Sequence, residues 1–191
     1  MKKLTVVIAE DDPIARRDIR EMLKEEGIVT IGECGDGAAA VSMARSLKPD
    51  LLLMDIKMPK LSGIEAAKQL NKEQVTPVLL LTAYSNRELI EQARVVGVLA
   101  YLVKPINKQN LIPACYIAVT RYEEFNILVN EIKDLNGAIE SRKLIEKAKG
   151  LLQKKYVIDE ESAFKKIRDI SMNQRKSMRE VAEAVILTLS D

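Results

Sequence analysis

Acidic, hydroxyl and ammonium side chains stand at the ends of four short apolar runs in this sequence. Glu10 and Asp11 follow the first run, and Asp55 follows the third. Thr82 closes the fourth run, and Lys104 follows the fifth. If the runs are parallel strands of one sheet, their carboxyl ends meet at the edge where open α/β sheets bind ligands. The sequence therefore predicts one site that combines these groups.

The residue types at this predicted edge indicate metal-assisted phosphoryl transfer. Clustered carboxylates repel one another unless a cation lies among them, and oxygen ligands without His or Cys select Mg²⁺ or Mn²⁺. Asp55 is then the nucleophile, the metal offsets charge, and Lys104 and Thr82 hold the other phosphoryl oxygens. The alternative is that these side chains are ordinary strand-end and helix-cap residues. That alternative explains poorly why four strand ends match the same site.

Composition excludes several classes of chemistry. The 191 residues contain no histidine, which removes Ser-His and Cys-His catalysis, His-ligated metals and a phosphohistidine on this chain. The net charge of +2 is too balanced to indicate a polyanionic partner. Cys34 and Cys115 are too few for a disulfide framework and indicate a reducing compartment. Because neither a membrane span nor a signal peptide is evident, we expect a cytoplasmic protein with no membrane partner.

Strand-like and helical patterns alternate over about the first 105 residues. The strand-like runs are Leu4–Ala9, Val29–Cys34, Leu51–Met54, Val78–Thr82 and Tyr101–Val103. The helical patterns are Ile14–Glu26, Ala38–Leu47, Ile64–Leu70 and Glu88–Val96, and capping boxes open the last two at Ser62–Glu65 and Ser85–Glu88. Strict alternation predicts a doubly wound α/β fold, with a parallel sheet and helices on both faces.

Four ordered motifs in this region resemble the receiver domain of two-component response regulators. They are Ile8–Pro13, Leu53–Pro59, Leu81–Ala83 and Tyr101–Pro105. The resemblance covers about residues 1–120 and implies a flavodoxin-like (βα)5 fold. It implies a phosphoacceptor regulator with at most autophosphatase activity, and not an enzyme.

The same resemblance implies a role for each residue of the acidic cluster. Asp55 would accept phosphate from the phosphohistidine of a sensor histidine kinase. Asp11 and Asp55 would bind Mg²⁺ together with the backbone carbonyl of Lys57, and Glu10 would assist through water.

The resemblance also implies a conformational switch. The Thr82 hydroxyl would swing to the phosphoryl group while the Tyr101 ring turns inward, and the Lys104–Pro105 bond would be cis. Lys57 and Tyr84 match variable positions beside the phosphate, where we expect them to tune the lifetime of phosphorylated Asp55.

From about Asn107 the sequence is helical. Apolar residues recur at spacings of three and four, the pattern of a short coiled coil, at Phe125, Leu128, Ile132, Leu135 and Ile139. An amphipathic helix packed on its own domain is the alternative. Three further helices near Arg142–Lys155, Glu160–Met172 and Met178–Leu189 predict a three-helix bundle. The predicted domains are 1–120, a coiled-coil linker at 121–139 and a helical domain at 130–191.

Charge is uneven in this helical part. Residues 113–140 carry two Lys or Arg and five Asp or Glu, whereas residues 141–179 carry twelve Lys or Arg and five Asp or Glu. A small module with this cationic surplus indicates nucleic-acid binding. A lysine-rich solvated surface is the alternative.

The pattern in the last third resembles the ANTAR domain, an RNA-binding antitermination module. The resemblance rests on Arg142–Leu152, Ser162–Arg168, Arg175 and Val181–Ala182, and covers about residues 130–191. The order of receiver, coiled coil and ANTAR domain is most similar to the ethanolamine-utilisation antiterminators of Gram-positive bacteria. The candidate RNA contacts are Arg142, Lys149, Gln153, Arg168 and Arg175. The apolar spacing predicts a core of Ala148, Ala163, Phe164, Ile167, Val181 and Ala182.

Together these patterns predict a response regulator that is switched by phosphorylation. Phosphorylated Asp55 would promote a homodimer that binds paired RNA stem-loops in nascent mRNA leaders and prevents transcription termination. Two alternatives stay open: a DNA-binding response regulator, and a receiver whose helical output binds another protein.

Overall fold

The computed structural model describes residues 3–83, 96–98 and 100–189. The chain divides into two compact units, Met1–Phe125 and Asn126–Asp191. We call them the α/β unit and the helical unit and describe each by itself. The predicted helix Glu88–Val96, its capping box at Ser85–Glu88, and Tyr84 lie outside the described residues, apart from Val96 itself.

The α/β unit is built on one parallel sheet with the strand order β2-β1-β3-β4-β5. The strands are β1 (Thr5–Ala9), β2 (Val29–Cys34), β3 (Leu51–Asp55), β4 (Val78–Thr82) and β5 (Ala100–Val103). This is the flavodoxin-like order, whose switch point lies between β1 and β3. The predicted doubly wound α/β fold is confirmed.

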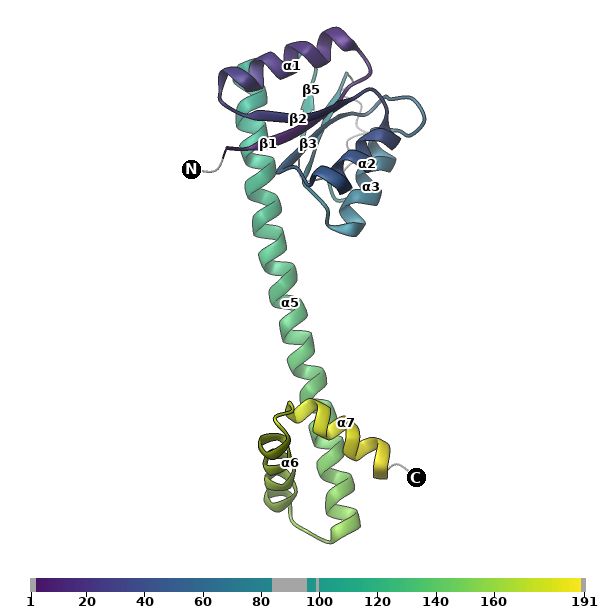
Figure 1. The fold of residues 1–191 in the computed structure, drawn as a ribbon, viewed down its shortest axis with the longest axis vertical. Coiled ribbons are helices and arrows are strands. Elements are labelled where there is room, and N and C mark those ends of the chain that lie inside the picture. The colour runs from purple at the N-terminus through teal and green to yellow at the C-terminus, as the bar shows by residue number, and fades with distance from the viewer. Residues whose placement is uncertain (1–2, 84–95, 99, 190–191) are drawn as a thin grey trace. The chain divides into compact units, whose positions relative to one another are not determined.

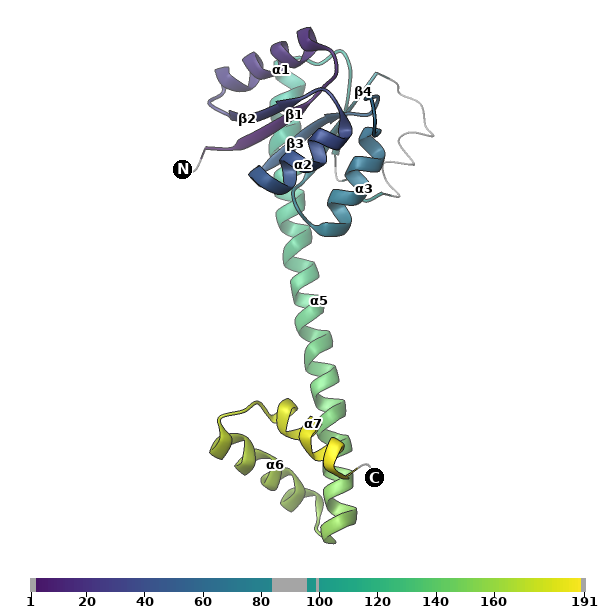
Figure 2. The ribbon, with the colours of Figure 1, turned by 45° about the vertical axis from the view of Figure 1, so that its right-hand side comes forward.

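Helices cover both faces of the sheet (Figures 1 and 2). They are α1 (Pro13–Glu25), α2 (Gly37–Leu47), α3 (Gly63–Glu73) and the first turns of α5 (Lys108–Tyr156). Residues of α2 and α3 pack with one set of alternating strand side chains, and residues of α1 and α5 pack with the other set. Because β3 and β4 are buried on both faces, they read as continuous apolar runs. The capping box of α3 at Ser62 and Glu65 is formed.

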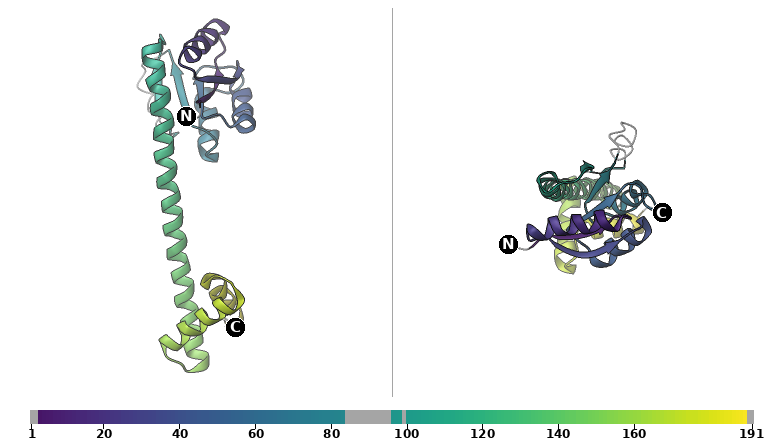
Figure 3. Two further views of the ribbon diagram at one scale, coloured as in Figure 1. Left: turned by 60° about the vertical axis from the view of Figure 1, so that its left-hand side comes forward. Right: turned by 90° about the horizontal axis from the view of Figure 1, so that it is seen from above.

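The helical unit consists of the C-terminal part of α5, α6 (Glu160–Gln174) and α7 (Met178–Leu189), as Figure 3 shows. The predicted coiled-coil segment 125–139 and the predicted helix Arg142–Lys155 are not separate elements, because both belong to α5. No proline falls between them, and the helix accommodates Gly137, whose carbonyl accepts a 2.8 Å hydrogen bond from the Ser141 hydroxyl. The apolar spacing of the residues therefore does not indicate by itself where a helix ends.

The bundle has a small apolar core. Its buried members are Ala148, Leu152, Ala163, Ile167, Val181 and Ala182. Phe164, which the sequence also predicts in the core, is 41% exposed, so that prediction is wrong. Phe164 directly follows the buried Ala163, and neighbouring helix positions lie about 100° apart, which turns its ring out of the core.

Side chains cap the N-termini of both α6 and α7. Asp159 accepts a 2.8 Å hydrogen bond from the Ser162 N–H, and Ser177 and Glu180 form a reciprocal capping box. None of the helices among the described residues combines the length and apolar character needed to cross a membrane.

Val157, the residue directly after α5, has a costly backbone conformation. It is a β-branched residue at φ 53°, in the left-handed region, and it is 91% exposed. Glycine is the usual residue where a helix ends in this conformation.

We expect Val157→Gly to stabilise the helical unit. Glycine removes the Cβ conflict, part of which is offset by its greater freedom in the unfolded chain, so the free energy of unfolding should rise by about 0.5–1 kcal/mol. Urea unfolding followed by circular dichroism measures the change. Val157→Ala keeps a Cβ and should gain less. A lower free energy of unfolding in the glycine variant would show that the Val157 side chain contributes contacts.

Candidate functional site

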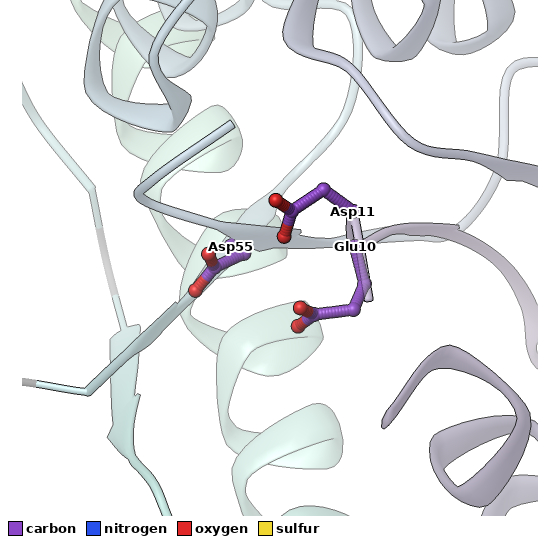
Figure 4. A group of neighbouring side chains, drawn as sticks. All are labelled: Glu10, Asp11 and Asp55. Atoms are coloured by element: carbon purple, nitrogen blue, oxygen red, sulfur yellow. The ribbon is translucent and has the colours of Figure 1, made fainter. Parts of the chain in front are cut away.

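Three carboxylates meet where the adjacent strands β1 and β3 end (Figure 4). Glu10 and Asp11 follow β1, and Asp55 ends β3, its direct neighbour. One oxygen from each of these three side chains lies within 4.8 Å of the others. Asp12, the next residue, is instead the N-cap of α1 and accepts from the Ile14 N–H at 2.8 Å. All three ligands are hard oxygen atoms, so the donor set fits Mg²⁺.

Lys104 supplies the positive charge of this cluster. It follows β5, and its Nζ lies 2.7 Å from Glu10 Oε2 and 3.2 Å from Asp55 Oδ1. The cis peptide bond between Lys104 and Pro105 agrees with the expectation from the receiver resemblance. The structure therefore brings Glu10, Asp11, Asp55 and Lys104 together, as the parallel strands predict.

Burial affects the two ends of the Glu10–Lys104 pair differently. Glu10 is 1% exposed, and this burial raises the pKa of its carboxyl, with the hydrogen bond from Lys104 opposing the shift. Burial would lower the pKa of Lys104, but its hydrogen bond to Glu10 and the charges of Asp55 and Glu10 raise that pKa. Lys104 is 25% exposed and keeps part of its hydration, which is why its carboxylate partners prevail.

The remaining predicted residues of this edge surround the cluster. Thr82 is buried at the end of β4, and its carbonyl accepts a 2.8 Å hydrogen bond from the Lys104 N–H. The Lys57 N–H donates to Asp55 Oδ2 at 3.2 Å, and the Lys57 side chain is exposed. Tyr101 lies on β5 and is exposed.

The loop after Asp55 is closely packed, and two glycines make this possible. A Cβ on Gly63, the first residue of α3, would collide with the carbonyl oxygen of Asp55. A Cβ on Gly37, the first residue of α2, would collide with the carbonyl oxygen of Leu61. A cavity of about 690 Å³ opens beside Asp11, Lys57 and the rest of this loop, which leaves room for a phosphoryl donor.

Arg16 is a residue that sequence reasoning missed. Its Nη1 donates to the backbone carbonyl of Glu10 at 2.6 Å and to that of Cys34 at 3.4 Å, so it joins the ends of β1 and β2. Its Nε lies 3.5 Å from Glu33 Oε2. A signal was available, because Arg16 is one helical turn after Asp12 and therefore points back toward the strand end. Arg16 fixes the backbone from which Glu10 and Asp11 extend.

The five candidate RNA contacts of the helical unit differ in exposure. Arg142, Arg168 and Arg175 are exposed, and Gln153 is half-buried. Lys149 is 6% exposed, and its Nζ lies 2.6 Å from Glu160 Oε1 and 2.9 Å from Glu146 Oε1. These hydrogen bonds, first that to Glu160, raise the pKa of Lys149.

The structure therefore counts against Lys149 as an RNA contact. The helical wheel places Lys149 opposite the apolar arc, but it does not show that the start of α6 covers this position. Lys149 instead joins α5 to the N-terminus of α6, and its ammonium also lies 5.9 Å from the centre of the Phe164 ring.

We expect Arg16→Ala to weaken cation binding at the cluster. Without the guanidinium, the end of β1 loses a strong charge-assisted hydrogen bond, so the affinity for Mg²⁺ should fall about tenfold, as measured by calorimetry. Arg20→Ala is the matched control, because the hydrogen bonds of Arg20 go to the side chains of Glu21 and Glu33, the latter at 3.1 Å. Equal Mg²⁺ affinity in both variants would contradict a positioning role for Arg16.

We expect Lys149→Ala to lower the melting temperature of the helical unit, because it leaves Glu146 and Glu160 facing each other without their shared cation. Arg142→Ala, an exposed cation on the same helix, should leave that temperature within the error of differential scanning calorimetry. A Lys149→Ala protein as stable as Arg142→Ala would show that this contact between α5 and α6 contributes little.

Comparisons with known proteins identify two families along the chain. The response regulator receiver domain matches residues 6–116, and the ANTAR domain matches residues 133–186. Among solved structures, the signal receiver domain of NarL from Mycobacterium tuberculosis superposes with a TM-score of 0.61 at 29% identity, and the match covers 63% of this chain and 98% of that chain.

Similarity to one regulator extends over nearly the whole chain, and similarity to another covers only part of it. The transcriptional regulatory protein PdtaR of Mycobacterium tuberculosis is 48% identical over 184 residues, which is 96% of this chain and 90% of that protein. The transcriptional regulatory protein YxjL of Bacillus subtilis is 35% identical over 59% of this chain and 52% of its own length. The chain belongs to the response regulators in which a receiver domain is followed by an ANTAR domain.

Proposed function

We propose that this protein is a transcription antiterminator that is switched by phosphorylation of Asp55. The observation that carries the proposal is the meeting of Asp55 with two further carboxylates and one lysine at a single sheet edge. In the reaction, a P–O bond to the Asp55 carboxylate forms as the P–N bond of the kinase's phosphohistidine breaks, and the imidazole keeps the electron pair.

Mg²⁺ would be held by Asp11, Asp55 and the Lys57 carbonyl, with Glu10 assisting through water. A bound Mg²⁺ supplies charge compensation to the phosphoryl oxygens during transfer. Lys104 holds a further phosphoryl oxygen, and its ammonium already lies 3.2 Å from Asp55 Oδ1. The buried Thr82 and the exposed Tyr101 form the switch pair that responds to the phosphoryl group.

Dimerisation transmits the switch to the helical output. The apolar residues of the predicted seam are exposed along α5 at Phe125, Leu128, Ile132, Leu135 and Ile139. In heptad terms, Ile132 and Ile139 occupy a positions and Leu128 and Leu135 occupy d positions, a distribution that favours a parallel two-stranded coiled coil. A parallel pair carries two ANTAR domains into one dimer.

The output is RNA. Residues 141–179 carry twelve Lys or Arg and five Asp or Glu, and the candidate contacts Arg142, Gln153, Arg168 and Arg175 reach the surface to different degrees. Two tethered modules raise the effective concentration at a pair of stem-loops. Binding to stem-loops that overlap a terminator would let transcription continue.

Gel shifts with tandem RNA hairpins test the proposal. The hairpins come from transcripts that crosslink to this protein in cells. Beryllofluoride, which mimics the phosphoryl group, should tighten binding at least tenfold, because it brings two modules to two hairpins. Asp55→Asn should show no gain. Ile132→Asp, which places two like charges opposite each other at one a position, should accept phosphate but lose the gain.

Equal affinity with and without beryllofluoride would rule out the switch. Tighter binding to duplex DNA than to hairpins of the same length would instead favour a DNA-binding regulator. Affinity for RNA that barely changes between 50 and 200 mM salt would favour a protein-binding output, since phosphate contacts release counterions.

A further inference from the structure

The helical unit contains a groove that the proposed RNA contacts leave out. The groove has a volume of about 260 Å³ and lies among the end of α5, one side of α6 and the length of α7. Its floor is apolar and includes the buried Leu152 and Val181 with the partly buried Ile170 and Val185. Pockets that hold drug-sized ligands measure roughly 300–1,000 Å³. The groove is smaller than these pockets, so it suits one flat group.

An aromatic side chain lines the groove beside a cation. Tyr156, the last residue of α5, is about half exposed, and the Nζ of Lys166 lies 4.2 Å from the centre of its ring. This distance is within the range of a cation–π interaction. The pair holds the ring in place and leaves part of its surface accessible to a ligand.

The charge at the rim is positive. Lys166 and Lys176 line the groove, and neither ammonium forms an ion pair with any residue the structure describes. The acidic residue at the rim, Glu180, is engaged by the capping box, where it accepts from the N–H and the hydroxyl of Ser177, each at 2.7 Å. The rim therefore carries two cations and one carboxylate. The hydrogen bonds from Ser177, and after them the charge of Lys176, lower the pKa of Glu180.

We propose that this groove binds one unpaired nucleotide of an RNA hairpin loop. The base stacks on Tyr156 above the apolar floor, and the adjoining phosphates contact Lys166 and Lys176. Aromatic stacking with neighbouring cations is how proteins bind unpaired bases. The inference rests on the RNA-binding output proposed above and adds which part of the RNA is recognised.

An apolar peptide is the occupant that the charges disfavour. Its side chains would fit the floor, but they would bring no counter-charge to a rim that carries two ammonium groups and one carboxylate. A nucleotide satisfies both parts at once, because its base is flat and largely apolar on its faces while its phosphate is anionic.

The test uses the full chain, activated with beryllofluoride, and two RNA probes. One is a hairpin with 2-aminopurine at an unpaired loop position, and the other is a blunt RNA duplex of the same length. Tyr156→Leu should weaken hairpin binding about 5- to 150-fold and abolish the fluorescence change of 2-aminopurine, with duplex binding unchanged. Tyr156→Phe, which keeps the ring, should bind like the unaltered protein. Lys166→Gln should reduce the salt dependence of hairpin binding by about one phosphate contact.

Tyr116→Leu is the matched control, since Tyr116 is similarly exposed but lies on α5 within the α/β unit. Calorimetric melting of each variant separates lost binding from lost folding, and 4-thiouridine crosslinking to the unaltered chain, mapped by mass spectrometry, tests the contact without any substitution. Hairpin binding by Tyr156→Leu at full strength, or crosslinks away from the Tyr156 peptide, would overturn the groove proposal alone. Failure of the unaltered protein to bind either RNA would overturn the RNA output and the groove together.

Discussion

The site of the α/β unit depends on the interaction of Lys104 with the two carboxylates that it bridges, those of Glu10 and Asp55. Parallel strands bring Glu10, Asp11 and Asp55 to one edge, and Glu10 is almost fully buried there. Like charges at this distance oppose one another strongly where little water can screen them. The Lys104 ammonium, 2.7 Å from Glu10 and 3.2 Å from Asp55, offsets this repulsion, so β5 is needed for charge balance as well as for the sheet.

Much of the α/β unit could be predicted from its sequence because its elements are short and strongly patterned. The strands Val29–Cys34 and Val78–Thr82 have the predicted bounds, and Leu51–Asp55 differs by one residue. Once the strands are parallel, their ends coincide, which is why Asp55 and Lys104 could be assigned to one site from widely separated positions. The register itself, including the irregularity between Val6 and Val7, depends on packing that no local pattern encodes.

Other features could not be predicted because they are tertiary contacts. The position of Arg16 one helical turn after Asp12 indicates that it points toward the strand end, but not that the carbonyls of two strands lie within reach of its guanidinium. Lys149 reads as a surface cation on the helical wheel, yet α6 brings Glu160 to within 2.6 Å of it. The same crossing of helices decides that Ala163 is buried while Phe164 is not. Periodicity identifies one face of a helix but does not show how far a neighbouring helix extends over it.

The two glycines that flank the loop after Asp55 limit how this site can vary. Gly63 and Gly37 bring the starts of α3 and α2 against the carbonyls of Asp55 and Leu61, so the backbone between them has one path. An insertion there would displace a helix start, whereas a changed side chain at the exposed Lys57 would leave the path intact. Outward-facing side chains on this loop can therefore be exchanged one at a time while its backbone keeps one shape.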